Sequence, residues 1–181
     1  MNKKLWIGVG LAVVLLVGWV IFRPELLLVN RTVSEEFPRT PRSTAAESQT
    51  PRQLLSGQFK GYAHPTEGAA SIYVMDSKRI LRLTNFRTSN GPDVHVYLVA
   101  APDATDDARV KNAAFVDLGS LKGNIGDQNY DVPNTVDLEK YRAVTIWCRR
   151  FSVNFGTAPL APTTDFSNDL GRGDGRWPTN R

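Results

Sequence analysis

One thiol is the side chain in this sequence best suited to redox chemistry or metal ligation. Cys148 is the single cysteine among 181 residues, and it lies in the run "VTIWCRRFSVNF" between Trp147 and the pair Arg149 and Arg150. One cysteine cannot form an intrachain disulfide. A neighbouring guanidinium favours the reactive thiolate, whereas burial disfavours it. The sequence therefore leaves two interpretations of Cys148, a reactive group or a small buried hydrophobic residue.

Three further side chains could act as axial ligands of a haem together with Cys148. They are His64, His95 and Met75, which are far apart in the sequence and could meet only through folding. A C-x-x-C-H motif is absent, so we do not expect covalently attached c-type haem. No motif identifies a metal. H-E-x-x-H and G-x-S-x-G are also absent, so we do not expect a stand-alone enzyme.

The run around Cys148 has the period of a β-strand and allows two arrangements. In a continuous strand, alternate residues share a face, which groups Val144, Ile146 and Cys148 on one side. The other side then carries Trp147, Phe151, Val153 and Phe155. If instead one core face persists, a bulge near Arg149 and Arg150 must shift the register. In either arrangement we expect at most one of the two arginines beside the thiol, unless a bulge brings both together.

The elements around this run indicate an all-β domain. Short apolar or alternating segments recur at 57–63, 70–75, 79–86, 93–100, 114–119, 144–148 and 151–155, separated by turn signals. This spacing is typical of a sandwich or a barrel. The turn "NGPD" has Gly91 for an unusual backbone angle and Pro92 and Asp93 to define the corner. Residues 135–141 could form one helical turn, and residues 121–130 a hairpin or loop.

The N-terminal residues predict attachment to a membrane. Residues 5–22 form an apolar run without a charge after Lys3 and Lys4, and no small-residue cleavage pattern follows it. We therefore expect residues 1–23 to be a cytoplasmic stub and an uncleaved transmembrane signal anchor. The remainder should lie outside the cytoplasm, in the periplasm or the extracellular space, as a single-pass membrane protein.

Composition predicts where the folded part begins and ends. Residues 24–53 are rich in Pro, Ser, Thr and charge and are predicted to be a flexible linker, and residues 161–181 a flexible tail. Residues 54–160 carry 12 Lys and Arg against 11 Asp and Glu, so the net charge of +4 comes mainly from the N-terminal region. A basic face for nucleic acid is therefore not expected.

Residues 54–160 contain the three blocks "GQFKGYAHPTEGAASIYVMDSKRILRLTNFRTSNGPDVHVYL", "DLGSLKGNIGDQNYDVP" and "VDLEKYRAVTIWCRRFSVNFGTAPL". In this order the blocks resemble the DM-thirteen domain, a Skeletor-type electron-transfer module related to the DOMON type. The resemblance implies a single β-sandwich. It also implies a redox cysteine that acts as a bare thiol or as a ligand to a prosthetic group such as haem.

Carried over by position, the resemblance places the redox cysteine at Cys148, the corner at Gly91-Pro92-Asp93 and a histidine at His64. It assigns no role to His95. We expect a membrane-anchored redox or electron-transfer module centred on Cys148, supported by Trp147, Arg149 and Arg150, that exchanges electrons with a partner protein. The alternative is a non-catalytic binding or assembly domain in which Cys148 is core packing.

Overall fold

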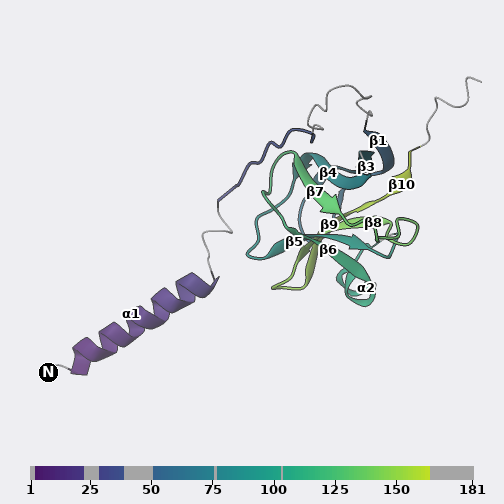
Figure 1. The fold of residues 1–181 in the computed structure, drawn as a ribbon. Helices are drawn as coiled ribbons and strands as arrows, with labels where there is room; N and C mark the ends of the chain where they lie inside the picture. The colour runs from purple at the N-terminus through teal and green to yellow at the C-terminus, as the bar shows by residue number, and fades with distance from the viewer. Residues whose placement is uncertain (1–2, 23–28, 39–50, 76, 103, 164–181) are drawn as a thin grey trace, which may run out of the picture.

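Alternating apolar residues form two antiparallel β-sheets that pack face to face, as Figure 1 shows. The computed structural model describes residues 3–22, 29–38, 51–75, 77–102 and 104–163. One sheet has the order β10-β1-β3-β4-β7 and the other the order β2-β9-β8-β5-β6. The predicted all-β sandwich is confirmed for the folded part of the chain.

Ten strands and two helices make up the described residues. They are α1 (Lys3–Phe22), β1 (Arg52–Gln58), β2 (Lys60–Gly61), β3 (Glu67–Met75), β4 (Lys78–Arg87), β5 (Val94–Val99), α2 (Asp107–Asn112), β6 (Phe115–Ser120), β7 (Gln128–Val132), β8 (Ala143–Cys148), β9 (Val153–Pro159) and β10 (Ala161–Pro162).

The two faces of the second sheet have different cores. In β5, Val94, Val96 and Leu98 point into the core between the sheets, while Tyr97 and Val99 point outward. The outward residues pack with Ala104 and Val110 in a second, smaller cluster beneath α2. The strand period of two accounts for both clusters, because successive residues alternate between the faces.

Helix α2 was not predicted: it begins at the end of the turn signal at residues 101–107 and lies between two predicted strands. Asp106 caps its N-terminus, because the Asp106 carboxylate accepts a hydrogen bond of 2.8 Å from the backbone N–H of Arg109. Two buried side chains, Asn154 and Thr157, donate hydrogen bonds to the carbonyl oxygen of Ala104 and hold the preceding loop. Within residues 135–141 the expected single helical turn is present, because the backbone N–H of Tyr141 donates a hydrogen bond of 2.9 Å to the carbonyl oxygen of Asp137.

Helix α1 occupies the apolar N-terminal run. Its described side chains include large apolar residues that are exposed, among them Trp6, Leu11 and Trp19. Over the described residues, no helix combines the length and the apolar character needed to cross a membrane. Insertion of residues 5–22 into a membrane therefore stays a prediction.

Residues 29–38, which fall inside the predicted linker, lie against the sandwich. The backbone N–H groups of Val33 and Glu35 donate hydrogen bonds of 2.9 and 3.0 Å to the carbonyl oxygens of Ile125 and Asp127. Phe37 meets the ring of Tyr73 edge to face at 5.0 Å. This segment is bound to the sandwich despite its polar composition, because backbone carbonyl groups of the loop before β7 accept its hydrogen bonds. We call residues 29–38 the docked segment.

The sandwich also extends past both predicted boundaries. Strand β1 begins at Arg52, within the predicted linker, and β10 pairs with it through Leu55 opposite Pro162 and Ser56 opposite Ala161. Two residues of the predicted tail therefore belong to the first sheet. The other parts of these two predictions lie outside the described residues, namely residues 24–28 and 39–50 of the linker and residues 164–181 of the tail.

Candidate functional site

Cys148 is the last residue of β8 and points into the core between the sheets. Its exposed fraction is 0%, and it shares the core cluster with Val94, Ile146 and Phe155. Cys148 stands opposite Val94 in the pairing of β8 with β5. The predicted grouping of Val144, Ile146 and Cys148 on one face is confirmed, because all three belong to this cluster.

Neither arrangement expected after Cys148 is present, because the chain turns back at residues 149–152. Ser152 adopts a left-handed backbone with φ of 54°, and Val153 then pairs with Cys148 across a hairpin. The register shift in this pair lies between Ile146 and Trp147, opposite Phe155. Phe155 is therefore an inward core residue, whereas Phe151 at the tip of the hairpin is 58% exposed.

The three residues expected to support the thiol lie away from it. Trp147 packs on the outer face of β8, where its ring stacks with that of Tyr97 at 6.5 Å. Arg149 is half exposed, and its guanidinium lies 3.8 Å from the carboxylate of Asp117. Arg150 is exposed at the hairpin tip. Neighbours in sequence therefore do not supply the surroundings of the Cys148 side chain, which come from the facing sheet and from β5 and β9.

The corner before β5 closes the end of the core near Cys148. A Cβ atom on Gly91 would lie 2.6 Å from Cγ2 of Val94 and 3.0 Å from Cζ of Phe155. Gly91 has no left-handed backbone angle, so the predicted reason for this glycine is wrong. Glycine is needed because the corner packs directly on Val94 and Phe155, both of which belong to the core cluster of Cys148.

The three remaining ligand candidates occupy separate places. The ring of His64 lies 4.0 Å from that of Phe155, in the loop before β3. Met75 is at the far end of β3, next to the turn into β4. His95 points to the outer face of the second sheet, where carboxylates face both of its ring nitrogens. Cys148 is thus not joined by any of them within the described part of the chain.

This arrangement does not fit a haem. Among the described residues, no three His, Cys, Asp or Glu side chains converge on a point that could hold a metal ion. A cavity of about 360 Å³ opens beside the corner, and its wall includes Val94, Asp93 and Ser120 but neither Cys148 nor a histidine. The nitrogens of His95 are already engaged, and Cys148 is enclosed by apolar side chains. We therefore assign no step to a prosthetic group.

His95 lies at the centre of a polar cluster that the sequence pattern did not predict. Its Nδ1 is 3.0 Å from Oδ1 of Asp117, and its Nε2 is 3.2 Å from Oδ1 of Asp93 and 3.3 Å from Oγ of Ser120. The His95 residue is only 7% exposed. The spacing Asp93-x-His95 was visible in the sequence, but Asp117 and Ser120 come from the neighbouring strand and only the fold brings them together.

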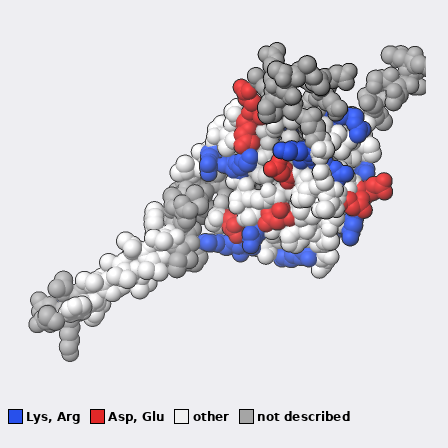
Figure 2. Space-filling view, in the orientation of Figure 1, with Lys and Arg blue, Asp and Glu red and all other residues white. Residues whose placement is uncertain are grey.

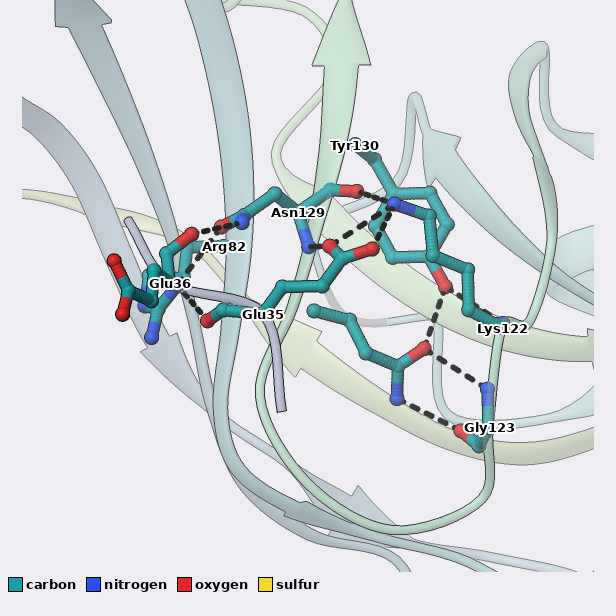
Figure 3. A network of polar contacts seen from close by, with 8 residues as sticks. Glu35, Glu36, Arg82, Lys122, Gly123, Asn129 and Tyr130 are labelled. Carbon is teal, nitrogen blue, oxygen red and sulfur yellow. Dashed lines mark hydrogen bonds and ion pairs between the residues drawn. The ribbon is translucent and has the colours of Figure 1, made fainter. Parts of the chain in front are cut away.

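A second polar network fastens the docked segment, and Figure 3 shows it from close by. Lys122 Nζ lies 2.8 and 3.0 Å from the two carboxylate oxygens of Glu35, and the backbone N–H of Asn129 donates to Glu35 at 2.7 Å. Burial alone would raise the pKa of Glu35, but the hydrogen bonds from Lys122 and Asn129 and the nearby positive charges lower it below its ordinary value.

Tyr130 joins this network through its hydroxyl group. Its hydroxyl donates to Oε1 of the buried Gln128 at 2.8 Å and accepts from the backbone N–H of Lys122 at 3.1 Å. Burial raises the pKa of Tyr130 to about 12. Gln128 also exchanges two hydrogen bonds with the backbone of Gly123. The loop that receives the docked segment is therefore held rigidly to β7.

The charged residues of the sandwich do not form a patch of one sign on the face that Figure 2 shows. Lysine and arginine side chains alternate there with aspartate and glutamate. This distribution agrees with the near balance of charge over residues 54–160.

The fold and the buried thiol define a class of protein, a small β-sandwich module with one cysteine at the end of an inner strand. Within that class the chain belongs to the electron transfer DM13 family, whose model matches residues 58–160. The match includes Cys148, both histidines and the Gly91-Pro92-Asp93 corner, and it leaves out the docked segment. Comparisons with curated proteins and with solved structures give no significant match.

Proposed function

We propose that this protein is a membrane-attached, extracytoplasmic redox module in which the thiol of Cys148 exchanges electrons with a partner protein. The observation that carries the proposal is the family match, which spans the sandwich and contains the single cysteine of the chain. The buried position of Cys148, near the corner and the hairpin tip, allows reaction only when this end of the sandwich opens.

Thiol–disulfide exchange is the redox reaction that one thiol can carry out without a prosthetic group. The thiolate of Cys148 attacks one sulfur of a disulfide in the partner. A new S–S bond forms between Cys148 and that sulfur, the partner's S–S bond breaks, and the second sulfur leaves as a thiolate. The Cys148 proton passes to solvent and the leaving thiolate takes up a proton, so the Cys148 sulfur is formally oxidised by one electron and the leaving sulfur is reduced by one.

Membrane attachment through residues 5–22 is supported by the uncharged apolar sequence of this run. Val29, the first residue of the docked segment, follows Phe22 by seven positions. Seven residues span at most about 25 Å when fully extended. Val29 lines the cavity beside Gly91 and Asp93. An inserted α1 would therefore keep the Cys148 end of the sandwich close to the membrane surface.

Mixed-disulfide formation tests the redox proposal. The full chain is incubated with oxidised glutathione under native conditions, and its intact mass is followed beside that of Cys148→Ser. We expect one glutathione on the wild-type chain and none on the variant. The expected rate exceeds the rate of global unfolding, because local opening suffices. Reaction only as fast as global unfolding would refute the proposal.

The second candidate function is a binding or assembly domain in which Cys148 is core packing. The observation that favours it is the complete burial of Cys148 among apolar side chains. Under this alternative, Cys148→Ala costs about 1 kcal/mol in packing and removes no chemistry. The glutathione experiment separates the two functions, because only the redox module reacts from a locally opened state.

A further inference from the structure

We infer that His95 is a positioning residue whose ring holds the end of the sandwich closed near Cys148 and so controls access to the thiol. This inference deepens the proposed function, and it rests on it only because it requires that a disulfide reagent or partner can reach the Cys148 thiol. The group of side chains involved is His95, Asp93, Asp117, Ser120 and Arg149, which we call the His95 cluster.

The geometry of the His95 cluster is that of a ring held between two carboxylates. Asp117 faces Nδ1 at 3.0 Å and Asp93 faces Nε2 at 3.2 Å, on opposite edges of the imidazole. The Arg149 guanidinium lies 3.8 Å from the other oxygen of Asp117. Ser120 is the remaining polar contact, 3.3 Å from Nε2. The ring of Tyr97 meets that of His95 at 6.3 Å.

These contacts connect three segments that meet at one end of the second sheet. Asp93 belongs to the corner before β5, Asp117 to β6, and Arg149 to the hairpin tip after β8. A backbone hydrogen bond also joins the hairpin tip to the corner, because the N–H of Arg149 donates to the carbonyl oxygen of Asp93 at 2.9 Å. His95 therefore connects the corner with β6, and Arg149 connects the hairpin tip with the corner and with β6.

The corner that His95 holds leads directly to the surroundings of Cys148. Val94 lies between Asp93 and His95 in sequence, and its side chain stands opposite Cys148 in the core. Gly91 packs on Val94 and Phe155, two members of the same core cluster. Movement of the corner away from the sheet would uncover this end of the core, whereas the far ends of β3 and β8 would stay in place.

The charge of the ring decides how well the cluster is bonded. An imidazolium donates from both nitrogens and can satisfy Asp93 and Asp117 together. A neutral imidazole has one N–H, so its other nitrogen offers a lone pair, which suits the hydroxyl of Ser120 but not a carboxylate. Loss of the proton therefore removes one charge-assisted hydrogen bond and favours opening of the corner.

The test is the accessibility of Cys148 as a function of pH in the full chain. The rate of reaction with a dipyridyl disulfide is measured for the native protein and divided by the rate for the urea-unfolded protein at the same pH. This ratio removes the pH dependence of the thiol itself and reports how often the site opens. We expect the wild-type ratio to rise as the pH rises. In His95→Gln it should be about tenfold higher than wild type at low pH and independent of pH.

His64→Gln is the matched control, because the chain has two histidines and both lie at this end of the molecule. It should keep the rise with pH. A flat wild-type ratio, a rise that survives in His95→Gln, or a rise that disappears in His64→Gln would each overturn the inference.

Two further measurements separate positioning from general stability. Urea denaturation of His95→Gln shows whether the whole fold has weakened. If it has, Asp93→Asn replaces it, because this variant keeps the ring and removes one of its two carboxylates. Asp93→Asn should then reduce the rise with pH, and an unchanged rise would overturn the inference. If the rise is present but glutathione does not react, the His95 cluster controls access and the redox proposal alone fails.

Discussion

Gly123→Ala is the sharpest test of the docked segment, because its effect should depend on residues that lie some ninety positions away in sequence. The three atoms that a Cβ on Gly123 would approach most closely all belong to Arg31 and Val33. It would overlap the carbonyl oxygen of Arg31 and lie 2.7 Å from Cγ2 of Val33. The backbone of Gly123 itself is not left-handed, so alanine is acceptable there once the docked segment is absent.

The expected cost follows from the contacts that the added methyl group would displace. Three hydrogen bonds lie beside Gly123: Arg31 N–H to Asn124 Oδ1 at 2.7 Å, Val33 N–H to the Ile125 carbonyl at 2.9 Å, and Ile125 N–H to the Arg31 carbonyl at 3.3 Å. At about 1 kcal/mol each they contribute about 3 kcal/mol. Release of the segment returns part of this as backbone entropy. We expect a net loss of about 1 to 2 kcal/mol.

The assay is urea denaturation of four chains in the same detergent, wild type and Gly123→Ala, each with and without residues 29–38. In the full chain the substitution should lower the free energy of unfolding by the amount above. In the shortened chain it should be neutral or slightly stabilising, because alanine restricts the unfolded backbone. An equal loss in both backgrounds would show that residues 29–38 do not dock on Gly123, and the reasoning would fail.

Three further predictions concern the docked segment and the Cys148 end. The pKa of Glu35 is lowered in the folded state, so its ion pair with Lys122 stabilises the fold above the ordinary carboxyl pKa, and this stabilisation is lost as the pH falls. Glu35→Gln should therefore have a lower free energy of unfolding than wild type at pH 7. Urea denaturation at successively lower pH should show this difference in free energy shrinking. The pKa of Tyr130 is raised to about 12, so the stability that its protonated hydroxyl contributes is complete below the pKa of the unfolded state and is lost as the pH rises toward 12. Tyr130→Phe should remove this loss of stability at alkaline pH, measured by circular dichroism. In chains that also carry Cys148→Ser, an environment-sensitive dye on Phe151→Cys should shift its emission to the blue in vesicles that hold the full chain. The same dye on Thr135→Cys, at the other end of the sandwich, should not shift, and equal shifts would contradict the proposed orientation.

The period of two was enough to predict that Cys148 shares a face of its strand with Val144 and Ile146, and the turn signals were enough to predict an all-β domain. The resemblance to the family, carried by "IWC" and "NGPD", predicted the sandwich and identified Cys148 as the characteristic cysteine. Local pattern is reliable for such features, because strand pleating and turn chemistry depend on residues that are close in sequence.

The surroundings of Cys148 could not be predicted in the same way. Arg149, Arg150 and Trp147 are its neighbours in sequence, yet the pleat and the hairpin turn direct them to the outer face or to solvent. The residues that enclose the thiol, such as Val94 and Phe155, come from other strands. Long-range register decides these contacts, and no local period encodes register between strands.

The amino-acid sequence by itself determined the single thiol, the apolar N-terminal run, the near-neutral charge of the sandwich and the all-β pattern, because each of these is a property of composition or of short periodicity. Tertiary structure alone decided that His95 lies between Asp93 and Asp117, that Glu35 is bonded to Lys122, and that polar residues 29–38 are part of the folded unit. The physical reason is the same in each case. Polar side chains and backbone groups take the partners that packing brings within hydrogen-bond distance, and those partners lie on strands and loops that are remote in sequence.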